Sequence, residues 1–385
     1  MKLYNSLTGK MENFSPLKKD EVSLYVCGIT PYDATHLGHL KTYAIFDVLN
    51  RFLNFSGFKV NYIQNITDVD PPLFRRANET GISYEKIAKV ETEKFVKNLD
   101  ELNIIRPTKF VKVSEEMNEI ILSIKDLISE NYAYVSDNVY FDSGKIKDFG
   151  KLSKLNKIEM LENPTFVKTE INSKNKKNSL DFLLWRITDE SPNWESPWGN
   201  GQPGWHIECS SIINSYFGKQ IDIHGGGSDL IFPHHECEIV QSEILNENNL
   251  ANYWVHVAPL NLNGEKMSKS MGNLIFVDDV LKKDSPEALR LYLASVHYRK
   301  PLEYNESKLE RFEKLNEFLN RPKKISNEKG KINYHKKIIS PLGDDLNTPI
   351  ALNEFINYTD EINKRGFTSY EESENYSEIK SLFGI

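Results

Sequence analysis

The sequence predicts an α/β fold with a Rossmann-like, doubly wound parallel sheet, an inserted α+β segment and a C-terminal helical region. The first observation is a β-prone apolar run at 23–26, an apolar helical pattern over 40–55 and a second β-prone run at 58–64. A strand, a helix and a strand in this order form the unit from which parallel sheets are built. The second observation is a β-prone run that ends in three glycines at 225–227 and precedes a helical pattern opened by Pro233. We expect these units to supply the two halves of one sheet.

The other segments follow from local patterns. Residues 1–21 carry turn-forming pairs and predict a leader hairpin. Residues 71–180 are largely helical and charged, and they predict an insertion between the halves of the sheet, with a small hairpin at 132–141 and the second half starting near Leu180. Further along, we expect a strand at 253–262, amphipathic helices at 285–299, 305–319 and 349–365, a Lys-rich linker at 321–334 and a polar tail.

Composition bounds the class of protein. The 385 residues are enough for two or three domains, and an apolar fraction of 39% allows a substantial core. The net charge of -7 provides no global basic field, so any RNA contact must be local. Three cysteines, an odd number, indicate a reducing compartment rather than a disulfide framework. No stretch approaches ~18 apolar residues, so we expect a cytoplasmic protein with no membrane partner.

The turn after the first strand pairs a thiol with two imidazoles. Cys27 is expected at the C-terminal end of that strand, and His36 and His39 at the start of the following helix. Ligands of open α/β sheets bind at this edge, and a helix N-terminus presents unpaired N–H groups to anions such as phosphate. Gly38, between the histidines, lets a flat ring approach the backbone. The pattern indicates a nucleoside triphosphate site; the alternative is a capped helix with two partly exposed histidines.

Two other strand ends are expected at the same edge. Thr67 and Asp68 follow the second strand and should face the crevice that holds Cys27. The glycines at 225–227 indicate a place where a ligand lies directly on the backbone. Both segments therefore belong to the predicted binding crevice.

Four residues of metal-ligand type could meet in this topology. His234 and Glu238 are four residues apart and share a helix face. With Cys27 and Cys209 they would offer two thiolates, an imidazole and a carboxylate, which suits tetrahedral Zn²⁺. The alternative is that both cysteines act as small buried hydrophobes. Cys237 could compete for the metal, although packing is the role we expect for it.

Two short motifs carry a family resemblance. HLGH at 36–39 resembles the HIGH motif of class I aminoacyl-tRNA synthetases, and KMSKS at 266–270 matches their second motif. The strings at 204–209 (GWHIEC) and 224–236 (HGGGSDLIFPHHE) resemble the cysteinyl-tRNA synthetase family in particular. Both motifs occur in the family's order, and the resemblance runs from residue 3 to about residue 354, including DDLNTP at 344–349.

The resemblance implies an ATP-dependent, AMP-forming, cysteine-specific ligase. It assigns zinc to Cys27, Cys209, His234 and Glu238. The implied catalytic residues are His36, His39, Lys266 and Lys269. The ATP site would consist of His36, Gly38, His39, Gly226, Gly227, Lys266 and Lys269, with Mg²⁺ bound to the ATP. Cysteine and its adenylate would be surrounded by Gly28, Thr30, Thr67, Trp205 and Asp229.

The resemblance also implies a domain division. The Rossmann-like catalytic domain would span 1–250, with the connective insertion at about 71–180. A KMSKS-bearing region that contacts the tRNA stem would span 251–300, and a helical region 301–385, without an evident anticodon-binding domain. We expect a monomer.

Some positions depart from the synthetase pattern and leave the acceptor open. The strings at 27–39 and 62–73 are closer to the mycothiol cysteine ligases, which couple cysteine to the amine of glucosaminyl-inositol. Synthetases usually have an Asp-Lys pair where Pro71-Pro72 stands and an Asn where Cys237 stands, whereas Glu238 and residues 261–266 are more synthetase-like. Three functions thus remain: transfer of cysteine to tRNA(Cys), transfer to an amino sugar, and inactive binding of RNA or a partner.

Zinc would address the selectivity of such an enzyme. Serine differs from cysteine only in oxygen for sulfur, and an apolar pocket separates such pairs poorly. A Zn²⁺ that accepts the substrate thiolate prefers sulfur. The cysteine carboxylate would then attack the α-phosphate of MgATP while the histidines and lysines of the two motifs stabilise the phosphate charge.

Overall fold

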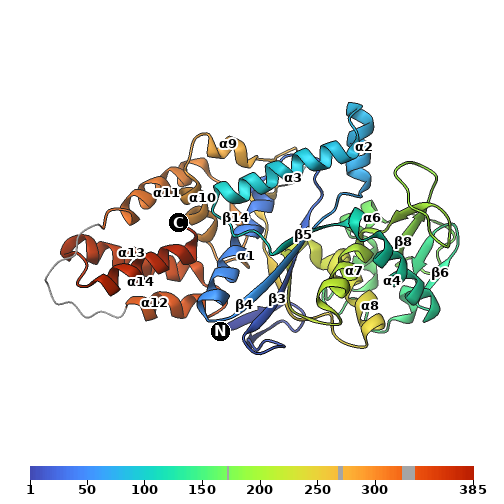
Figure 1. The fold of residues 1–385 in the computed structure, drawn as a ribbon, viewed down its shortest axis with the longest axis horizontal. Coiled ribbons are helices and arrows are strands. Elements are labelled where there is room, and N and C mark those ends of the chain that lie inside the picture. Colours follow the sequence, from blue (N-terminus) through green and yellow to red (C-terminus); the bar gives the residue numbers. More distant parts are fainter. Residues whose placement is uncertain (171–172, 268–271, 323–333) are drawn as a thin grey trace.

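The computed structural model covers residues 1–385 and describes all of them except 171–172, 268–271 and 323–333. Three regions lie along its longest axis (Figure 1): C-terminal helices, a central parallel sheet, and a smaller antiparallel sheet with its own helices. Among the described residues, no helix is both long and apolar enough to cross a membrane.

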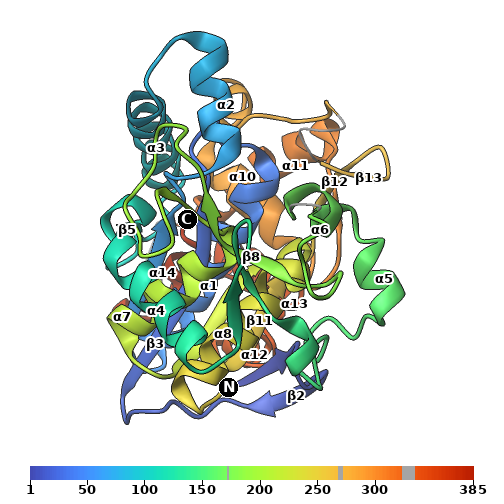
Figure 2. The same ribbon diagram turned by 90° about the vertical axis from the view of Figure 1, so that its right-hand side faces the viewer.

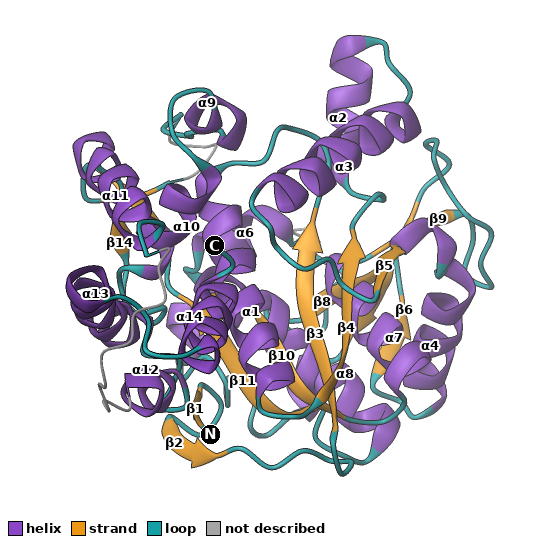
Figure 3. Cartoon of the chain, turned by 60° about the vertical axis from the view of Figure 1, so that its left-hand side comes forward, coloured by secondary structure: helices purple, strands orange, loops and turns teal. Residues whose placement is uncertain are grey.

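The central sheet is parallel and has the strand order β11-β10-β3-β4-β5. From β3 the chain builds outward on one side through β4 and β5, and later on the other side through β10 and β11. The order therefore reverses between β3 and β10 (Figure 3), the place where ligands bind in such sheets. The strands are β3 (Glu21–Ile29), β4 (Lys59–Ile66), β5 (Lys109–Lys112), β10 (Ile221–Gly227) and β11 (Ala251–Val257).

Strand β3 is longer than the sequence predicts. Cys27 was expected at its end, but β3 continues to Ile29, which pairs with Ile66 after an irregularity that follows Val26. The pairing of β3 with β10 extends only to Val26. Cys27 thus follows the last residue pair between β3 and β10 and lies where these two strands separate.

Helices cover both faces of this sheet, as its alternating side chains require. Leu24 and Val26 of β3 pack in a core with α1 (Leu37–Phe55) and α10 (Pro286–Ala294). Tyr25 and Cys27 point to the other core, built with α4 (Met117–Ser129), α7 (Trp205–Phe217) and α8 (Glu236–Asn246). The doubly wound arrangement is therefore confirmed.

The antiparallel sheet has the order β6-β7-β8-β9. The hairpin predicted at 132–141 is present as its first two strands. The prediction that the second half of the parallel sheet begins near Leu180 is wrong, because the strand after Leu180 pairs with the hairpin. The strands are β6 (Ala133–Val135), β7 (Val139–Phe141), β8 (Phe182–Ile187) and β9 (Gly201–Pro203).

The C-terminal region is helical to its end. The prediction of a polar tail after residue 365 is wrong, because Tyr370–Phe383 forms helix α14. Its end returns to the region of the parallel sheet, where Arg51 of α1 donates to the carbonyl of Ser381 and Asn103 to that of Gly384. The other helices here are α11 (Glu306–Leu319), α12 (Tyr334–Leu342) and α13 (Thr348–Arg365). Most of the predicted linker lies outside the described residues.

The remaining elements frame these parts. The leader hairpin is confirmed, and the predicted strand at 253–262 is divided between β11 and a short strand of another sheet (Figure 2). The elements are β1 (Lys2–Asn5), β2 (Lys10–Asn13), α2 (Pro71–Thr80), α3 (Tyr84–Glu101), η1 (Val113–Glu115), η2 (Ser143–Lys145), α5 (Lys157–Leu161), α6 (Pro164–Thr169), η3 (Ser228–Leu230), η4 (Ile231–His235), β12 (Leu260–Leu262), β13 (Glu265–Lys266), α9 (Val277–Leu281) and β14 (Leu302–Glu303).

Candidate active site and metal centre

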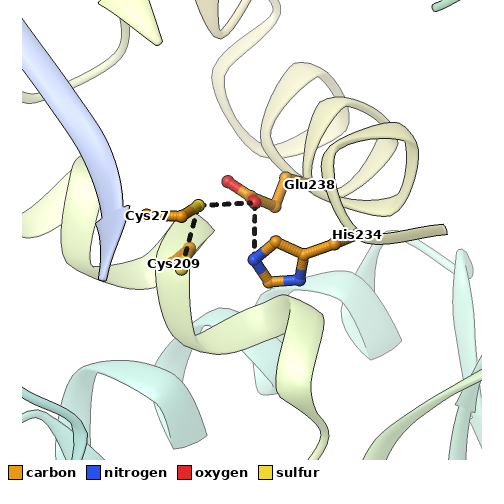
Figure 4. Close-up of side chains that lie close together, drawn as sticks. All are labelled: Cys27, Cys209, His234 and Glu238. Atoms are coloured by element: carbon orange, nitrogen blue, oxygen red, sulfur yellow. Dashed lines mark hydrogen bonds and ion pairs between the residues drawn. The ribbon is translucent and has the colours of Figure 1, made fainter. Parts of the chain in front are cut away.

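The four predicted metal ligands converge in the interior. Cys27 comes from β3, Cys209 from α7, and His234 and Glu238 from the kinked helical segment η4–α8 (Figure 4). One ligand atom from each lies within 4.8 Å of every other, and all four residues are buried. Cys27 Sγ lies 4.0 Å from Cys209 Sγ and 3.8 Å from Glu238 Oε1, and His234 Nε2 lies 3.0 Å from the same oxygen.

The surrounding side chains hold Glu238 in place. His224 Nε2 lies 2.7 Å from Glu238 Oε2, so the other carboxylate oxygen, Oε1, faces the two cysteines and His234. Burial alone would raise the pKa of Glu238, but His224 and His234 outweigh it and lower the pKa to about 2. Burial likewise opposes an ionised Cys209, yet the neighbouring Cys27 thiol and His234 lower its pKa to about 6. This cluster therefore concentrates thiolate and carboxylate charge beside imidazoles.

The donor set fits zinc. Two sulfurs, one imidazole nitrogen and one carboxylate oxygen are the ligand types that Zn²⁺ takes in proteins. Both thiols are free, so they are available as ligands. A second group, Cys27, His224, His235 and Glu238, also brings its ligand atoms within 4.8 Å of one another. It shares two residues with the first, so the two sets describe one centre. Cys237 is buried in the apolar core and belongs to neither set.

A cavity of about 390 Å³ opens above this centre. Its walls come from the C-terminal ends of β3, β4 and β10 and from the start of α1, the edge at which the sequence predicts a site. All five residues expected around cysteine and its adenylate line the cavity, as do Cys27 and His234. These five are Gly28, Thr30, Thr67, Trp205 and Asp229.

Both motif histidines lie at the start of α1. His36 is the N-cap, its Nδ1 accepts from the Gly38 amide at 3.1 Å, and its ring centroid lies 3.8 Å from that of His39. Burial, together with nearby His39 and Lys266, lowers the pKa of His36 to about 2. Burial and Lys266 lower the pKa of His39 to about 4, although Asp229 acts in the opposite direction. Both imidazoles are thus neutral at pH 7. Because His36 Nδ1 accepts, its proton is assigned to Nε2, which is free to donate.

The second motif is described only in part. Lys266 lies on β13 at the mouth of the cavity, and its Nζ is 2.9 Å from Asp229 Oδ2. Partial removal from water would raise the pKa of the half-exposed Asp229 carboxylate, but Lys266 outweighs this effect and lowers the pKa. Lys269 lies outside the described residues. Lys266 is therefore the motif lysine that the structure places at the cavity.

The three glycines at the end of β10 have different surroundings. A Cβ at Gly225 would lie 2.1 Å from the Phe46 ring, so this glycine allows α1 to pack closely on the strand. A Cβ at Gly226 would come within 3.1 Å of the His235 ring, and Gly226 is not among the cavity-lining residues. Gly227 does line the cavity. The predicted contact between backbone and ligand is thus limited to Gly227, because Phe46 packs on Gly225 and His235 packs on Gly226.

Sequence reasoning did not single out several site residues. Asn65 and Asp70 line the cavity; Asn65 Oδ1 accepts from the Gly28 amide at 2.7 Å, and Asp70 Oδ2 accepts from Thr30 Oγ1 at 2.8 Å. Asp68 was expected in the crevice, but its carboxylate accepts from the amide and hydroxyl of Ser114. No local signal separates Asp68 from Asp70, because only the contact with Ser114 holds Asp68 away from the cavity.

Comparisons with known proteins agree with this architecture. Residues 13–314 match the family model described as tRNA synthetases class I (C) catalytic domain. The chain is 41% identical to a protein named cysteine--tRNA ligase from Francisella philomiragia, covering 94% of this chain and 80% of that protein. It is 40% identical to one of the same name from Caldicellulosiruptor saccharolyticus, covering 100% and 87%.

Solved structures of other synthetases share the fold. Mycobacterium tuberculosis methionyl-tRNA synthetase in complex with methionyl-adenylate aligns with a TM-score of 0.67 at 13% identity, covering 94% of this chain and 89% of that one. A leucyl-tRNA synthetase complex from Agrobacterium radiobacter aligns with a TM-score of 0.66 at 9% identity, covering 96% and 84%. The family match, the relatives and the fold together show that this chain belongs to the cysteinyl-tRNA synthetase family of class I aminoacyl-tRNA synthetases and is an ATP-dependent ligase.

Proposed function

We propose that the protein activates L-cysteine with MgATP in this cavity, forming cysteinyl-AMP and pyrophosphate, and then transfers cysteine to tRNA(Cys). The observation that carries the proposal is the position of the cluster formed by Cys27, Cys209, His234 and Glu238. It lies beneath a cavity whose rim holds His36, His39 and Lys266. A sulfur-binding centre and a phosphate-binding rim thus open into one space.

The four clustered residues would hold one zinc ion. Bound there, zinc would supply a site that prefers the sulfur of cysteine to the oxygen of serine. Trp205 stacks on the His234 ring, with centroids 4.2 Å apart and an angle of 18° between the planes. The indole therefore holds His234 in orientation while forming one wall of the cavity.

The rim residues would act on ATP. As the cysteine carboxylate attacks the α-phosphate, negative charge grows on the phosphate oxygens and pyrophosphate leaves. His36 Nε2–H and the His39 ring are neutral donors that can stabilise this charge without becoming ionised. Lys266 adds positive charge, and Asp229 holds its Nζ at the cavity before ATP arrives. Lys269 is proposed to add positive charge at the phosphates as well, because of its place in the motif. Gly38 and Gly227 are proposed to let ATP approach the backbone closely.

The acceptor is proposed from the relatives. Proteins named cysteine--tRNA ligase match 80% or more of this chain, which favours tRNA(Cys) as the acceptor. Under this proposal the catalytic domain spans 1–250, the stem-contact region 251–300 and the helical region 301–385. The Pro71-Pro72 pair, where synthetases usually have Asp-Lys, begins α2, and Pro72 lines the cavity. Because the surrounding string is closer to the mycothiol cysteine ligases, an amino-sugar acceptor is the second candidate.

One assay series tests these steps separately. Purified protein is incubated with ATP, labelled pyrophosphate and either cysteine or serine, and exchange is measured; then tRNA or glucosaminyl-inositol is added to ATP and labelled cysteine. We expect exchange with cysteine only and transfer to tRNA. Equal exchange with serine would contradict the selective site, whereas transfer to the amino sugar alone would replace the proposed acceptor and leave the activation step intact.

Substitution of a ligand tests the metal centre. Cys209→Ser is expected to lower the zinc content, measured by elemental analysis, and to abolish cysteine-dependent exchange. Cys237→Ser is the matched control, because Cys237 is equally buried but belongs to neither ligand group. Full zinc content and exchange in Cys209→Ser would remove the metal assignment.

A further inference from the structure

Helix α1 carries a fully buried lysine two residues after the second motif histidine. The side chain of Lys41 has no exposed surface. Its Nζ donates to the carbonyls of Ala258 at 2.6 Å, Pro259 at 3.2 Å and Lys300 at 3.1 Å. An ammonium group has three N–H donors, so these three acceptors match its hydrogen-bonding capacity.

This arrangement is unusual for a cation. Buried charges are commonly paired with an opposite charge, because removal from water is unfavourable. The acceptors of Lys41 are all backbone carbonyls, and burial lowers its pKa to about 8. A methionine or leucine would fill the same helix position without that penalty. We therefore infer that Lys41 is present because it holds the three carbonyls in place.

The three carbonyls belong to the segments that form one small sheet. Ala258 and Pro259 connect β11 to β12, and Lys300 directly precedes the segment that enters β14. Leu260 of β12 pairs with Leu302 of β14. Lys41 therefore fixes both strands at the end where they enter the sheet.

The same sheet carries the motif lysine. Asn261 of β12 pairs with Lys266 of β13, and the Met267 amide donates to the Leu260 carbonyl at 3.0 Å. From Val257 to Leu260 the chain also lines the cavity. Lys41 on the histidine-bearing helix is thus connected through its hydrogen bonds to Ala258 and Pro259, and through the adjoining β12, to the amide of Met267, which directly follows Lys266.

We propose that Lys41 is a positioning residue for cysteine activation. Its ammonium group clamps the β12–β13–β14 sheet onto helix α1, so that Lys266 reaches Asp229 and the ATP phosphates at a fixed distance from His36 and His39. The inference rests on the role proposed above for Lys266. It assigns no substrate contact to Lys41 itself, because three protein carbonyls occupy all of its donors.

Arg290 offers a matched control for a merely structural role. It is also a buried cation that donates to backbone carbonyls of distant segments, those of Phe383 and Leu102, and it contacts α1 through Asp47. It braces the middle of α1 and the end of α14, and it is not among the residues that line the cavity. Loss of Arg290 should therefore lower stability without affecting the position of Lys266.

A double-mutant cycle tests the proposal. The kcat of cysteine-dependent ATP–pyrophosphate exchange is measured for the full chain and for Lys41→Met, Lys266→Ala and the double variant. We expect each single variant to lose at least tenfold in kcat with the KM for cysteine unchanged, and the double variant to be within twofold of Lys266→Ala. Arg290→Met should lower Tm and change kcat by the same factor in both backgrounds.

If Lys266→Ala is impaired and the kcat loss of the double variant equals the product of the two single losses, the role proposed for Lys41 is overturned. The role proposed for Lys266 would then stand. Full exchange by Lys266→Ala would instead remove the role proposed for Lys266, and with it this inference. If Lys41→Met does not fold, Lys41→Gln, which keeps two donors, takes its place in the cycle.

A second readout is independent of activity. Lys41→Met should increase hydrogen exchange at the Met267 amide, which is bonded to β12, and Arg290→Met should not. Lys41→Arg, which retains buried donors and charge, should restore part of the protection. Unchanged exchange at this amide in Lys41→Met would contradict the clamp.

Discussion

Replacement of Asp70 by asparagine should stabilise the protein at neutral pH. The Asp70 carboxylate lines the cavity and accepts a hydrogen bond from Thr30 Oγ1 at 2.8 Å. Burial raises its pKa from 3.8 to about 6, although Thr30 and the nearby Arg75 act in the opposite direction. The folded protein therefore holds this carboxylate in a place that disfavours its charge, and asparagine would remove the charge while it keeps an acceptor for Thr30.

The magnitude follows from linkage. A displacement of about two pH units, at about 1.4 kcal/mol per unit, corresponds to roughly 3 kcal/mol of instability when Asp70 is ionised in both the folded and unfolded states. Because the folded pKa is the higher one, the folded state takes up the proton first as the pH falls from about 6 to 3.8. The advantage of Asp70→Asn should therefore fall to about half at pH 5 and disappear below the unfolded pKa of 3.8.

Urea unfolding at pH 7 and pH 5 measures both effects. Asp70→Asn should raise the free energy of unfolding by up to about 3 kcal/mol at pH 7 and by about half as much at pH 5. Glu79→Gln is the control, an exposed carboxylate on α2, and should change it by less than about 0.5 kcal/mol. A gain that is absent at pH 7, or that grows toward pH 5, would refute the reasoning.

Three further substitutions test other parts of the structure. Gly28→Ala places a Cβ 1.7 Å from the Asn65 carbonyl oxygen, so it should push β3 away from β4 and weaken cysteine binding. The free energy of unfolding in urea should fall by about 3 kcal/mol or more, and wild-type stability would contradict the close approach. Asp345→Ala removes the buried acceptor of the Tyr4 amide, the Tyr298 hydroxyl and Arg299. The free energy of unfolding should therefore fall by about 3 kcal/mol, and a decrease in Tm of less than 2 °C would contradict a stabilising role for Asp345. Lys266→Ala should reduce the kcat of ATP–pyrophosphate exchange at least tenfold. The urea midpoint should stay unchanged, because both partners of the ion pair with Asp229 are about half exposed. A loss of unfolding free energy as large as the free energy that corresponds to the kcat loss would indicate a structural role instead.

The parallel core was predictable because local patterns encode its strands and helices, whereas the full ligand cluster was predicted through the family resemblance. Strand β3, helix α1 and strand β4 each contain apolar residues that are buried in the two cores, and the helix begins directly after His36. His234 and Glu238 lie on one helix face by spacing alone. The KMSKS and HLGH motifs indicated the class of synthetase, and the strings at 204–209 and 224–236 indicated the family.

Other features depend on long-range contacts that no local pattern encodes. Residues 182–187 are apolar and β-prone in either sheet, and only pairing with β7 places them in the antiparallel one. The polar segment after residue 365 forms α14 because Tyr376 and Phe383 are buried against the preceding helices. Gly225 and Gly226 were interpreted as a ligand cradle, since sequence cannot show that Phe46 and His235 take that space. Asp68 and Asp70 are two residues apart, and only the contact with Ser114 separates their roles.

A metal held by Cys27, Cys209, His234 and Glu238 is proposed to bind the sulfur of the substrate cysteine. Cobalt(II)-substituted protein measures this directly, because thiolate binding to cobalt changes its absorption in the near ultraviolet. Adding cysteine should increase the thiolate-to-metal charge-transfer band beyond that of the two protein thiolates, and serine should leave it unchanged. An identical spectrum with and without cysteine would contradict the account.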